Sequence, residues 1–159
     1  MEQQQIFVQM ALNAWNTQVQ KADKFFESLN DEGLLKEVAP GKNRIIYLLG
    51  HLIAVNDNII SLFGAGERLY AHFDEAFVKM PDRSGLDIPQ PADLRKEWKR
   101  SNEVLSSYFE RMTASDWFSR HTAMTDEDLI KEPTRNKLSV LINRTNHVAY
   151  HLGQLVLAN

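Results

Sequence analysis

Four long segments of this chain carry apolar residues at three- and four-residue intervals, and this pattern constrains the fold more than any other feature. Such spacing gathers the apolar side chains on one face of an α-helix. The segments are centred near residues 2–29, 44–63, 91–112 and 137–157. Almost nothing alternates apolar and polar residues as a half-buried strand would. The sequence therefore predicts an all-α fold in which the four helices pack as a four-helix bundle.

The segment 44–63 has the widest apolar face and should lie at the centre of the bundle. We expect Asn43 to cap the start of this helix after a Pro40-Gly41 turn, and Gly64 to end it. Its expected core residues are Ile45, Leu48, Leu49, Leu52, Ile53, Ile59, Ile60 and Phe63.

Each of the other three helices has an expected inner stripe. In the first helix the inward residues are Phe7, Ala11, Ala14, Ala22, Phe25 and Leu29. In the third helix, which Pro91 should begin, they are Leu94, Trp98, Ser101, Leu105, Tyr108 and Met112. In the fourth helix they are Leu138, Leu141, Ile142, Thr145, Val148, Leu152 and Val156. The first helix has further apolar residues that a homodimer would cover, namely Ile6, Trp15, Val19 and Phe26.

The connections between the helices differ in length. Residues 64–90 and 113–136 are too long for tight turns between bundle helices, so both should contain short helices. We expect one over Glu67 to Met80, and another that begins at Thr125. No internal repeat, low-complexity tract or linker interrupts the pattern, which predicts a single domain over residues 1–159.

Composition excludes several classes of function. The net charge of −3 and the lack of a basic cluster argue against nucleic-acid binding. No apolar run approaches the length of a membrane span, and the start of the chain lacks the pattern of a signal peptide, so we expect a cytoplasmic protein without a membrane partner. The absence of cysteine excludes disulfides, thiolate ligands and a cysteine nucleophile. Any thiol chemistry would therefore need an exogenous thiol.

Three of the five histidines lie inside apolar helical segments, where they need a polar partner. His147 and His151 are four positions apart, so both face the same side of the fourth helix. His51 lies about eight residues, or roughly 12 Å, from the start of the second helix, and His151 about seven residues, or roughly 10 Å, from the end of the fourth. If these helices run antiparallel with level ends, His51 and His151 meet at one depth, with His147 a turn further in.

Three neutral imidazoles that converge in this way can bind one metal ion and leave coordination positions open for water or substrate. All-nitrogen ligation suits zinc, nickel, iron or copper rather than magnesium or calcium. We expect local polar support from Asn58, Asn143 and Gln154, space around the imidazole of His51 from Gly50, and a pocket that opens onto the site. Because binding requires neutral imidazoles, metal occupancy should fall below about pH 6.5.

Other interpretations of these residues stay open. The pair could be partly exposed helix residues, and His51 could be a histidine at the core edge bonded to a carbonyl. Gly153 marks either a close approach by another group or a merely tolerated glycine. The remaining histidines, His72 and His121, should be surface residues. The three tryptophans should be core or interface anchors rather than a substrate box, namely Trp15, Trp98 and Trp117.

The sequence lacks the motifs that several other kinds of catalytic or metal site require. The chain has no Glu-x-x-His, which a ferritin-like di-iron site requires, and no His-Glu-x-x-His of a zincin protease. It also has no Gly-x-Ser-x-Gly of a serine hydrolase. A haem with two axial histidines would leave the third histidine without a role.

The sequence resembles the DinB/YfiT-like superfamily of bacterial metal-binding four-helix bundles. The resemblance rests on Leu-Leu-Gly-His51-Leu in the second helix and on Asn-His147-Val-Ala-Tyr-His151-Leu-Gly-Gln154 in the fourth. It covers essentially the whole chain and implies an up-down-down-up order of helices with a long central crossover. It also implies a divalent metal, often nickel or zinc, on three histidines that match His51, His147 and His151. Leu152 replaces a frequent arginine of the family, which alters the surroundings of the site and removes no ligand.

The resemblance also directs the expectation of function. Characterised relatives include S-transferases and isomerases that use low-molecular-weight thiols such as bacillithiol or mycothiol, and the family often dimerises. We therefore expect a divalent-metal-binding protein, with nickel or zinc favoured and iron also compatible. Its leading function is a metal-dependent enzyme for a small-molecule substrate, with thiol S-transfer favoured over hydrolysis; no catalytic residue is assigned. The alternatives are a non-catalytic bundle that binds metal or a small molecule, and a plain structural bundle with incidental histidines.

Overall fold

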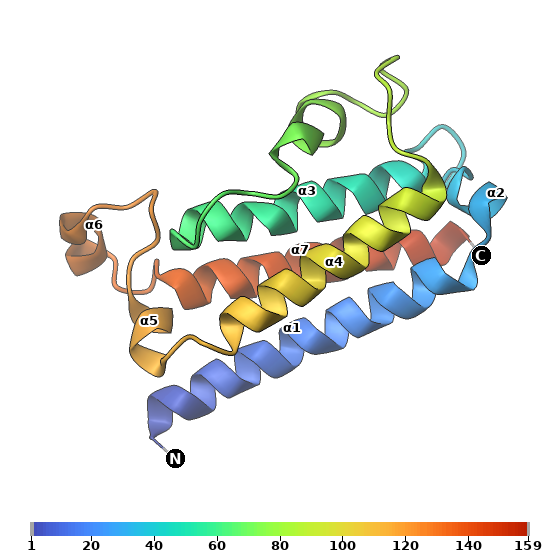
Figure 1. The fold of residues 1–159 in the computed structure, drawn as a ribbon. Helices are drawn as coiled ribbons and strands as arrows, with labels where there is room; N and C mark the ends of the chain where they lie inside the picture. The colour runs from blue at the N-terminus through green and yellow to red at the C-terminus, as the bar shows by residue number, and fades with distance from the viewer. Residues whose placement is uncertain (1, 159) are drawn as a thin grey trace.

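The computed structural model describes residues 2–158 and shows an all-α bundle (Figure 1). Four long helices form it: α1 (Gln3–Ser28), α3 (Ile45–Phe63), α4 (Pro91–Phe109) and α7 (Lys137–Leu155). Helices α1 and α7 run in one direction, and α3 and α4 run in the other (Figure 1). The predicted four-helix bundle and its up-down-down-up order are therefore confirmed. Among residues 2–158 the extended pairing is limited to an isolated bridge between Glu37 and Arg44.

Short elements occupy the connections, as expected from their length. They are α2 (Asp31–Leu34), the 3₁₀ turn η1 (Ala71–Phe73), the π-helical segment η2 (Glu75–Lys79), α5 (Ala114–Phe118), α6 (Asp126–Lys131) and the terminal 3₁₀ turn η3 (Val156–Ala158). The helix expected over Glu67 to Met80 is present only as η1 and η2. The helix expected after Thr125 is confirmed, because the Thr125 side chain accepts a hydrogen bond from the Asp128 N–H as its N-cap.

Helix α3 is the central element, and all eight of its expected core residues are buried. It ends as predicted at Gly64, which has a left-handed φ of 67°. Its N-cap is Arg44 rather than Asn43. The Arg44 N–H and guanidinium both bond the carboxylate of Asp82, at 2.8 and 2.7 Å, so a residue distant in sequence fixes this start.

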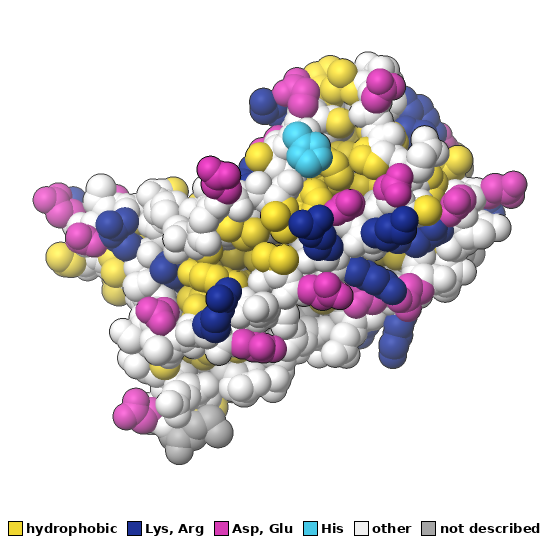
Figure 2. Space-filling view, in the orientation of Figure 1, with side chains coloured by type: hydrophobic (Ala, Val, Ile, Leu, Met, Phe, Trp, Pro, Cys, Tyr) yellow, Lys and Arg dark blue, Asp and Glu magenta, His cyan; other side chains and the backbone are white. Residues whose placement is uncertain are grey.

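By length and composition α3 could cross a membrane, with a mean hydropathy of 1.5. The expectation that no apolar run approaches that length is therefore wrong for α3. The bundle accounts for the apolar composition of α3, because 67% of the 18-residue apolar window in this helix is buried inside the bundle. On the face shown in Figure 2, charged side chains of both signs are interspersed around apolar patches.

The buried face of α1 is wider than the expected one, and the expected stripe is only partly confirmed: Ala22 and Phe25 are buried as predicted, and Ala11 and Leu29 are half-buried. Phe7 and Ala14 are exposed, whereas Trp15, Val19 and Phe26 lie in the core. Ring packing accounts for two of the added core residues, because Trp15 packs edge-on against Phe109 of α4, and Phe26 against Trp98. Most residues that suggested a homodimer are therefore covered within one chain. The apolar side chains that stay exposed on α1 are Ile6, Phe7 and Met10.

The stripes of α4 and α7 agree better with the sequence. In α7, Ile142 and Val156 are 46% and 53% exposed and are corrections to the expected stripe. All three tryptophans are buried anchors, as predicted, with Trp98 and Trp117 at 2% and 0% exposure.

A buried carboxylate fastens the long 64–90 connection onto α3. Asp57 is fully buried and accepts hydrogen bonds from the backbone N–H groups of Leu69 and Tyr70, at 3.1 and 3.0 Å. It also accepts one from Arg68 Nε at 3.1 Å, and Arg68 pairs in turn with Asp74 at 2.6 Å. The connection is thus fastened to α3, and its segment η2 supplies Phe77, whose carbonyl oxygen lies 2.7 Å from Nδ1 of His51; Figure 1 shows the connection alongside α3.

Candidate metal centre

The structure brings His51, His147 and His151 together at one point between α3 and α7. The Nε2 atom of His147 lies 3.2 Å from that of His51 and 3.0 Å from that of His151. The ring of His51 is equidistant from the other two, at 5.1 Å between centroids. The antiparallel run of α3 and α7 and the four-residue spacing of the pair produce this meeting. The three predicted ligands are therefore adjacent, with His51 level with the middle of the pair.

Two of the three rings are oriented by hydrogen bonds on their outer nitrogens. Nδ1 of His51 lies 2.7 Å from the carbonyl oxygen of Phe77, and Nδ1 of His151 lies 2.8 Å from Oε1 of Gln154. Both oxygens accept, so each Nδ1 carries the proton and each Nε2 presents its lone pair to the common point. This is the tautomer that a metal ligand needs.

The expected polar support is confirmed only in part. Gln154 serves His151, but Asn143 is exposed and Asn58 makes no hydrogen bond with residues 2–158. Nδ1 of His147 is buried and also lacks a partner within that range. Ligating histidines usually donate their outer ring proton to a carboxylate, a carbonyl or a water, and for His147 no protein group among residues 2–158 fills that place.

The donor set fits a divalent metal ion. Lone pairs that face one another at 3.0–3.2 Å repel unless a proton or a cation lies between them. Two nitrogens that each lie about 2.0–2.1 Å from one ion, at angles between about 90° and 109°, are about 2.8–3.4 Å apart. The two separations that involve His147 fall inside that interval, and all three nitrogens lie within 4.8 Å of one another.

Burial keeps the three imidazoles neutral. Desolvation lowers the pKa of His51 and of His151, against the opposing effects of the Phe77 carbonyl and of Gln154. The pKa of His147 falls to about 4, because desolvation is joined by the charges of the other two histidines and of Arg144. All three therefore offer free nitrogens at neutral pH.

Gly50 allows Phe77, the hydrogen-bond partner of His51, to pack against α3. A Cβ atom at residue 50 would lie 2.3 Å from the ring of Phe77, so only glycine lets that ring lie against α3. The same residue, Phe77 in η2, supplies the carbonyl that accepts from His51. The expectation that Gly50 leaves space for the imidazole is corrected, because the space is taken by Phe77. Sequence reasoning missed Phe77, since a main-chain acceptor leaves no signature in residue type.

Gly153 and the other two histidines have no such role. A Cβ atom at Gly153 would meet no atom of a neighbouring element within 4 Å, so no other helix approaches it closely, and the approach of a ligand stays a prediction. His72 is exposed, as expected, and His121 is half-buried in the 113–136 connection.

Arg144 is a second residue that sequence reasoning missed. It lies three positions before His147 and seven before His151, and so shares their face of α7. Its side chain is half-buried, and its Nε atom is buried without a hydrogen-bond partner among residues 2–158. Its charge contributes to the lowered pKa of both His51 and His147. The spacing from the histidine pair was the signal that could have found it.

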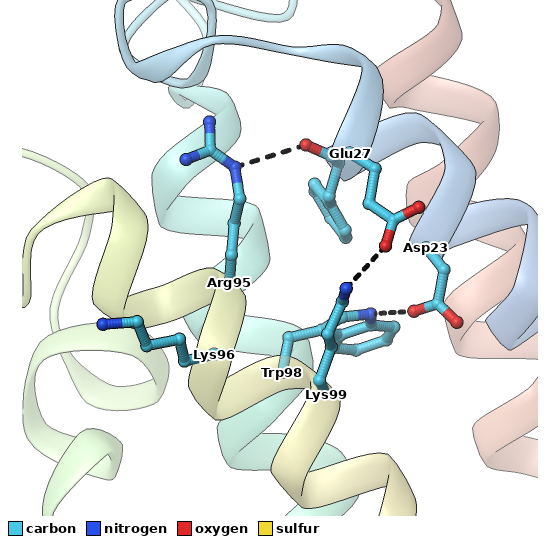
Figure 3. A pocket seen from close by; sticks show the side chains of 7 residues that line it. Asp23, Glu27, Arg95, Lys96, Trp98 and Lys99 are labelled. Carbon is cyan, nitrogen blue, oxygen red and sulfur yellow. Dashed lines mark hydrogen bonds and ion pairs between the residues drawn. The ribbon is translucent and has the colours of Figure 1, made fainter.

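Two surface hollows among residues 2–158 bear on the search for a pocket, and neither is lined by the three histidines. A cavity of about 130 Å³ lies between α1 and α4, over Phe26 and Trp98, and is rimmed by charged side chains (Figure 3). There Trp98 donates to Asp23, and Lys99 pairs with Glu27 at 2.6 Å, so this cavity belongs to the α1–α4 seam. A larger hollow of about 310 Å³ is lined in part by Gln154, the partner of His151. A substrate pocket that opens onto the three histidines stays a prediction.

Comparison with known proteins places the chain in a family. The model of the DinB superfamily matches residues 14–155, a range that contains all three histidines. The chain belongs to the DinB superfamily. The fold is shared with the crystal structure of a conserved protein from Enterococcus faecalis, at a TM-score of 0.64 over 99% of this chain and 95% of that chain. The two sequences are 15% identical, so this likeness concerns the fold alone. No curated protein matches the chain.

Proposed function

We propose that this DinB-superfamily protein binds one divalent metal ion through the Nε2 atoms of His51, His147 and His151. The observation that supports the proposal is the convergence of three lone-pair nitrogens, two of them with their tautomers fixed by acceptors on the outer side. Membership of a generally metal-binding superfamily agrees with it. Zinc and nickel suit the three imidazoles best, and iron is also compatible.

We further propose that the bound metal is catalytic, in a cytoplasmic enzyme acting on small molecules. Three protein ligands leave coordination positions for a thiol or a water, as in catalytic rather than structural sites. A divalent ion held here would lower the pKa of such a ligand and supply a nucleophile near neutral pH. The protein's own part is to hold three neutral nitrogens, to fix two of their tautomers and to keep the rings in place.

Transfer of a low-molecular-weight thiol to an electrophile is favoured over hydrolysis, on the resemblance to thiol-dependent relatives. The chain has no cysteine, so the thiol would come from solution. A non-catalytic bundle that binds metal or a small molecule is the alternative function. A homodimer is also proposed, with Ile6, Phe7 and Met10 as its remaining apolar surface on α1.

Elemental analysis of protein purified without a histidine tag tests the metal. We expect about one equivalent of zinc or nickel per chain, lost in His51→Ala, His147→Ala and His151→Ala. His72→Ala is the matched control, because His72 is an exposed histidine away from the three. Wild-type protein that takes up no divalent metal, or a control that loses it equally, would contradict the metal site.

Turnover separates the enzyme from the binding module. The assay supplies a small thiol and a halogenated electrophile to the metal-loaded protein and follows loss of free thiol. We expect turnover that disappears in His151→Ala and persists in His72→Ala. Metal binding without turnover on these substrates or on ester substrates would favour the non-catalytic alternative.

A further inference from the structure

Arg144 carries a charge that the protein itself does not neutralise. Arginines of comparable burial are paired, as in Arg44 with Asp82 at 2.7 Å and Arg68 with Asp57 at 3.1 Å. The side chain of Arg144 makes no ion pair or hydrogen bond with the described residues 2–158, and its Nε atom is buried. An unpaired polar group inside a fold costs free energy, so its persistence calls for an explanation.

The position of Arg144 supplies that explanation. Its Cα atom lies about 4.5 Å along the axis of α7 from that of His147, on the same face of the helix. On α3, half-buried residues continue from His51 along one face at three- and four-residue intervals: Val55, Asn58 and Leu62. A half-buried strip thus runs on both helices from the histidines toward the middle of the bundle. Arg144 is the cation on this strip.

We propose that Arg144 binds the carboxylate of a small substrate whose reacting group lies at His51, His147 and His151. The inference deepens the proposed function and rests on it, since it assigns the chemical class of the substrate. A guanidinium presents two parallel N–H groups that match the two oxygens of a carboxylate. One guanidinium balances one negative charge, which fits a carboxylate better than a phosphate dianion.

The energetic consequence of this role differs from that of a structural arginine. Replacing an unpaired, half-buried cation by a neutral side chain removes a desolvation cost and breaks no hydrogen bond or ion pair with residues 2–158. Arg144→Gln should therefore unfold at the same temperature as the wild type or at a higher one. A structural arginine would give a lower unfolding temperature.

Matched thiols test the inference on the cobalt-loaded protein, in which thiolate binding gives a charge-transfer band. The probes are 3-mercaptopropionate and 3-mercapto-1-propanol, which differ in the carboxylate. We expect the wild type to bind the acid at least about tenfold more tightly than the alcohol. Arg144→Gln should lose this preference, Arg144→Lys should retain part of it, and Arg111→Gln should retain all of it, since the exposed Arg111 side chain bonds only the carbonyl of Ser107. An equal preference in wild type and Arg144→Gln would overturn the inference.

Two further measurements separate the possible failures. Cobalt content is measured in every variant, and metal-free protein is titrated with propionate and with inorganic phosphate while the histidine ring signals are followed by NMR. If the wild type binds no cobalt, the proposed metal-binding function is contradicted. The carboxylate site at Arg144 is still supported if propionate shifts the histidine ring signals of the wild type and does not shift those of Arg144→Gln. Tighter binding of phosphate than of propionate overturns the carboxylate assignment. A lower unfolding temperature of Arg144→Gln overturns the binding role in favour of a structural one.

Discussion

At the scale of single residues, Gly50 connects the packing of the long connection to the chemistry of His51. In Gly50→Ala the new methyl group would meet the ring of Phe77 at 2.3 Å, and the ring must move. The carbonyl of Phe77 moves with it, and His51 loses the acceptor that fixes its tautomer. We expect metal affinity to fall about 10–100-fold and unfolding free energy to fall by about 1–3 kcal/mol. Metal competition titration and urea unfolding measure the two effects.

Gly153→Ala is the matched control for that substitution. Gly153 also lies in a helix beside a histidine, but a Cβ atom there meets open space. The change should stabilise the protein by about 0.5–1 kcal/mol through helix propensity and leave metal affinity unchanged. Equal losses in both variants would show that the contact between Gly50 and Phe77 does not support the site.

A further prediction concerns Gln154, the hydrogen-bond partner of His151 on α7. Gln154→Ala removes the acceptor of His151 Nδ1, which frees the ring to rotate and to exchange tautomers. We expect metal affinity to fall about 10–100-fold, with little change in stability because Gln154 is only half-buried. Gln154→Glu, which retains an acceptor, should restore most of the affinity. An equilibrium zinc titration with a chromogenic chelator decides between these outcomes.

The site residues that could be predicted from the sequence are those whose side chains face the site directly. The pair His147 and His151 follows from helical spacing, and His51 from its place in an apolar helix. Phe77 acts through its main chain and leaves no signal in the sequence. Arg144 left a signal in its spacing from the pair, but a charged residue on an otherwise mixed stripe is ordinarily solvated.

At the scale of elements, the 64–90 connection should depend on Asp57. Asp57→Ala leaves the guanidinium of Arg68 and two backbone N–H groups without their buried acceptor. We expect a loss of about 3–5 kcal/mol in unfolding free energy, measured in urea. Metal affinity should fall as well, because the same connection carries Phe77. The exposed pair of Glu132 and Arg135 is the control, and Glu132→Ala should cost less than about 1 kcal/mol.

The elements themselves were predictable to different degrees. Helix α3 was found with its core, because its apolar face is wide and Gly64 ends it. The inner face of α1 was found only in part, because its apolar residues form two overlapping stripes, and how far each is buried depends on partners such as Phe109 and Trp98. The start of α3 depends on Asp82, which is remote in sequence. Local pattern therefore locates a helix more reliably than it orients one.

At the scale of the whole molecule, the histidines couple folding to pH. In the metal-free protein the folded state lowers the pKa of all three below the ordinary 6.5, that of His147 to about 4. Between those values the unfolded chain binds more protons than the folded one, so unfolding free energy decreases as pH falls below 6.5. The lowered pKa values also mean that metal occupancy should persist to a lower pH than the ordinary histidine value suggests.

Urea unfolding of metal-free protein between pH 7.5 and 5 measures this coupling. The carboxyls of Asp74 and Asp82 have a lowered pKa and stay ionised over that range, while burial raises the pKa of Asp23. We expect the unfolding midpoint to fall steadily below pH 6.5 in the wild type and less steeply in His147→Gln, which removes the histidine with the lowest pKa. His72→Gln should follow the wild type. Saturating zinc should flatten the wild-type curve until protons displace the metal, because the metal binds only the neutral rings. Identical slopes in wild type and His147→Gln would show that the three histidines are not held neutral by the fold, and the coupling between folding and this site would be lost.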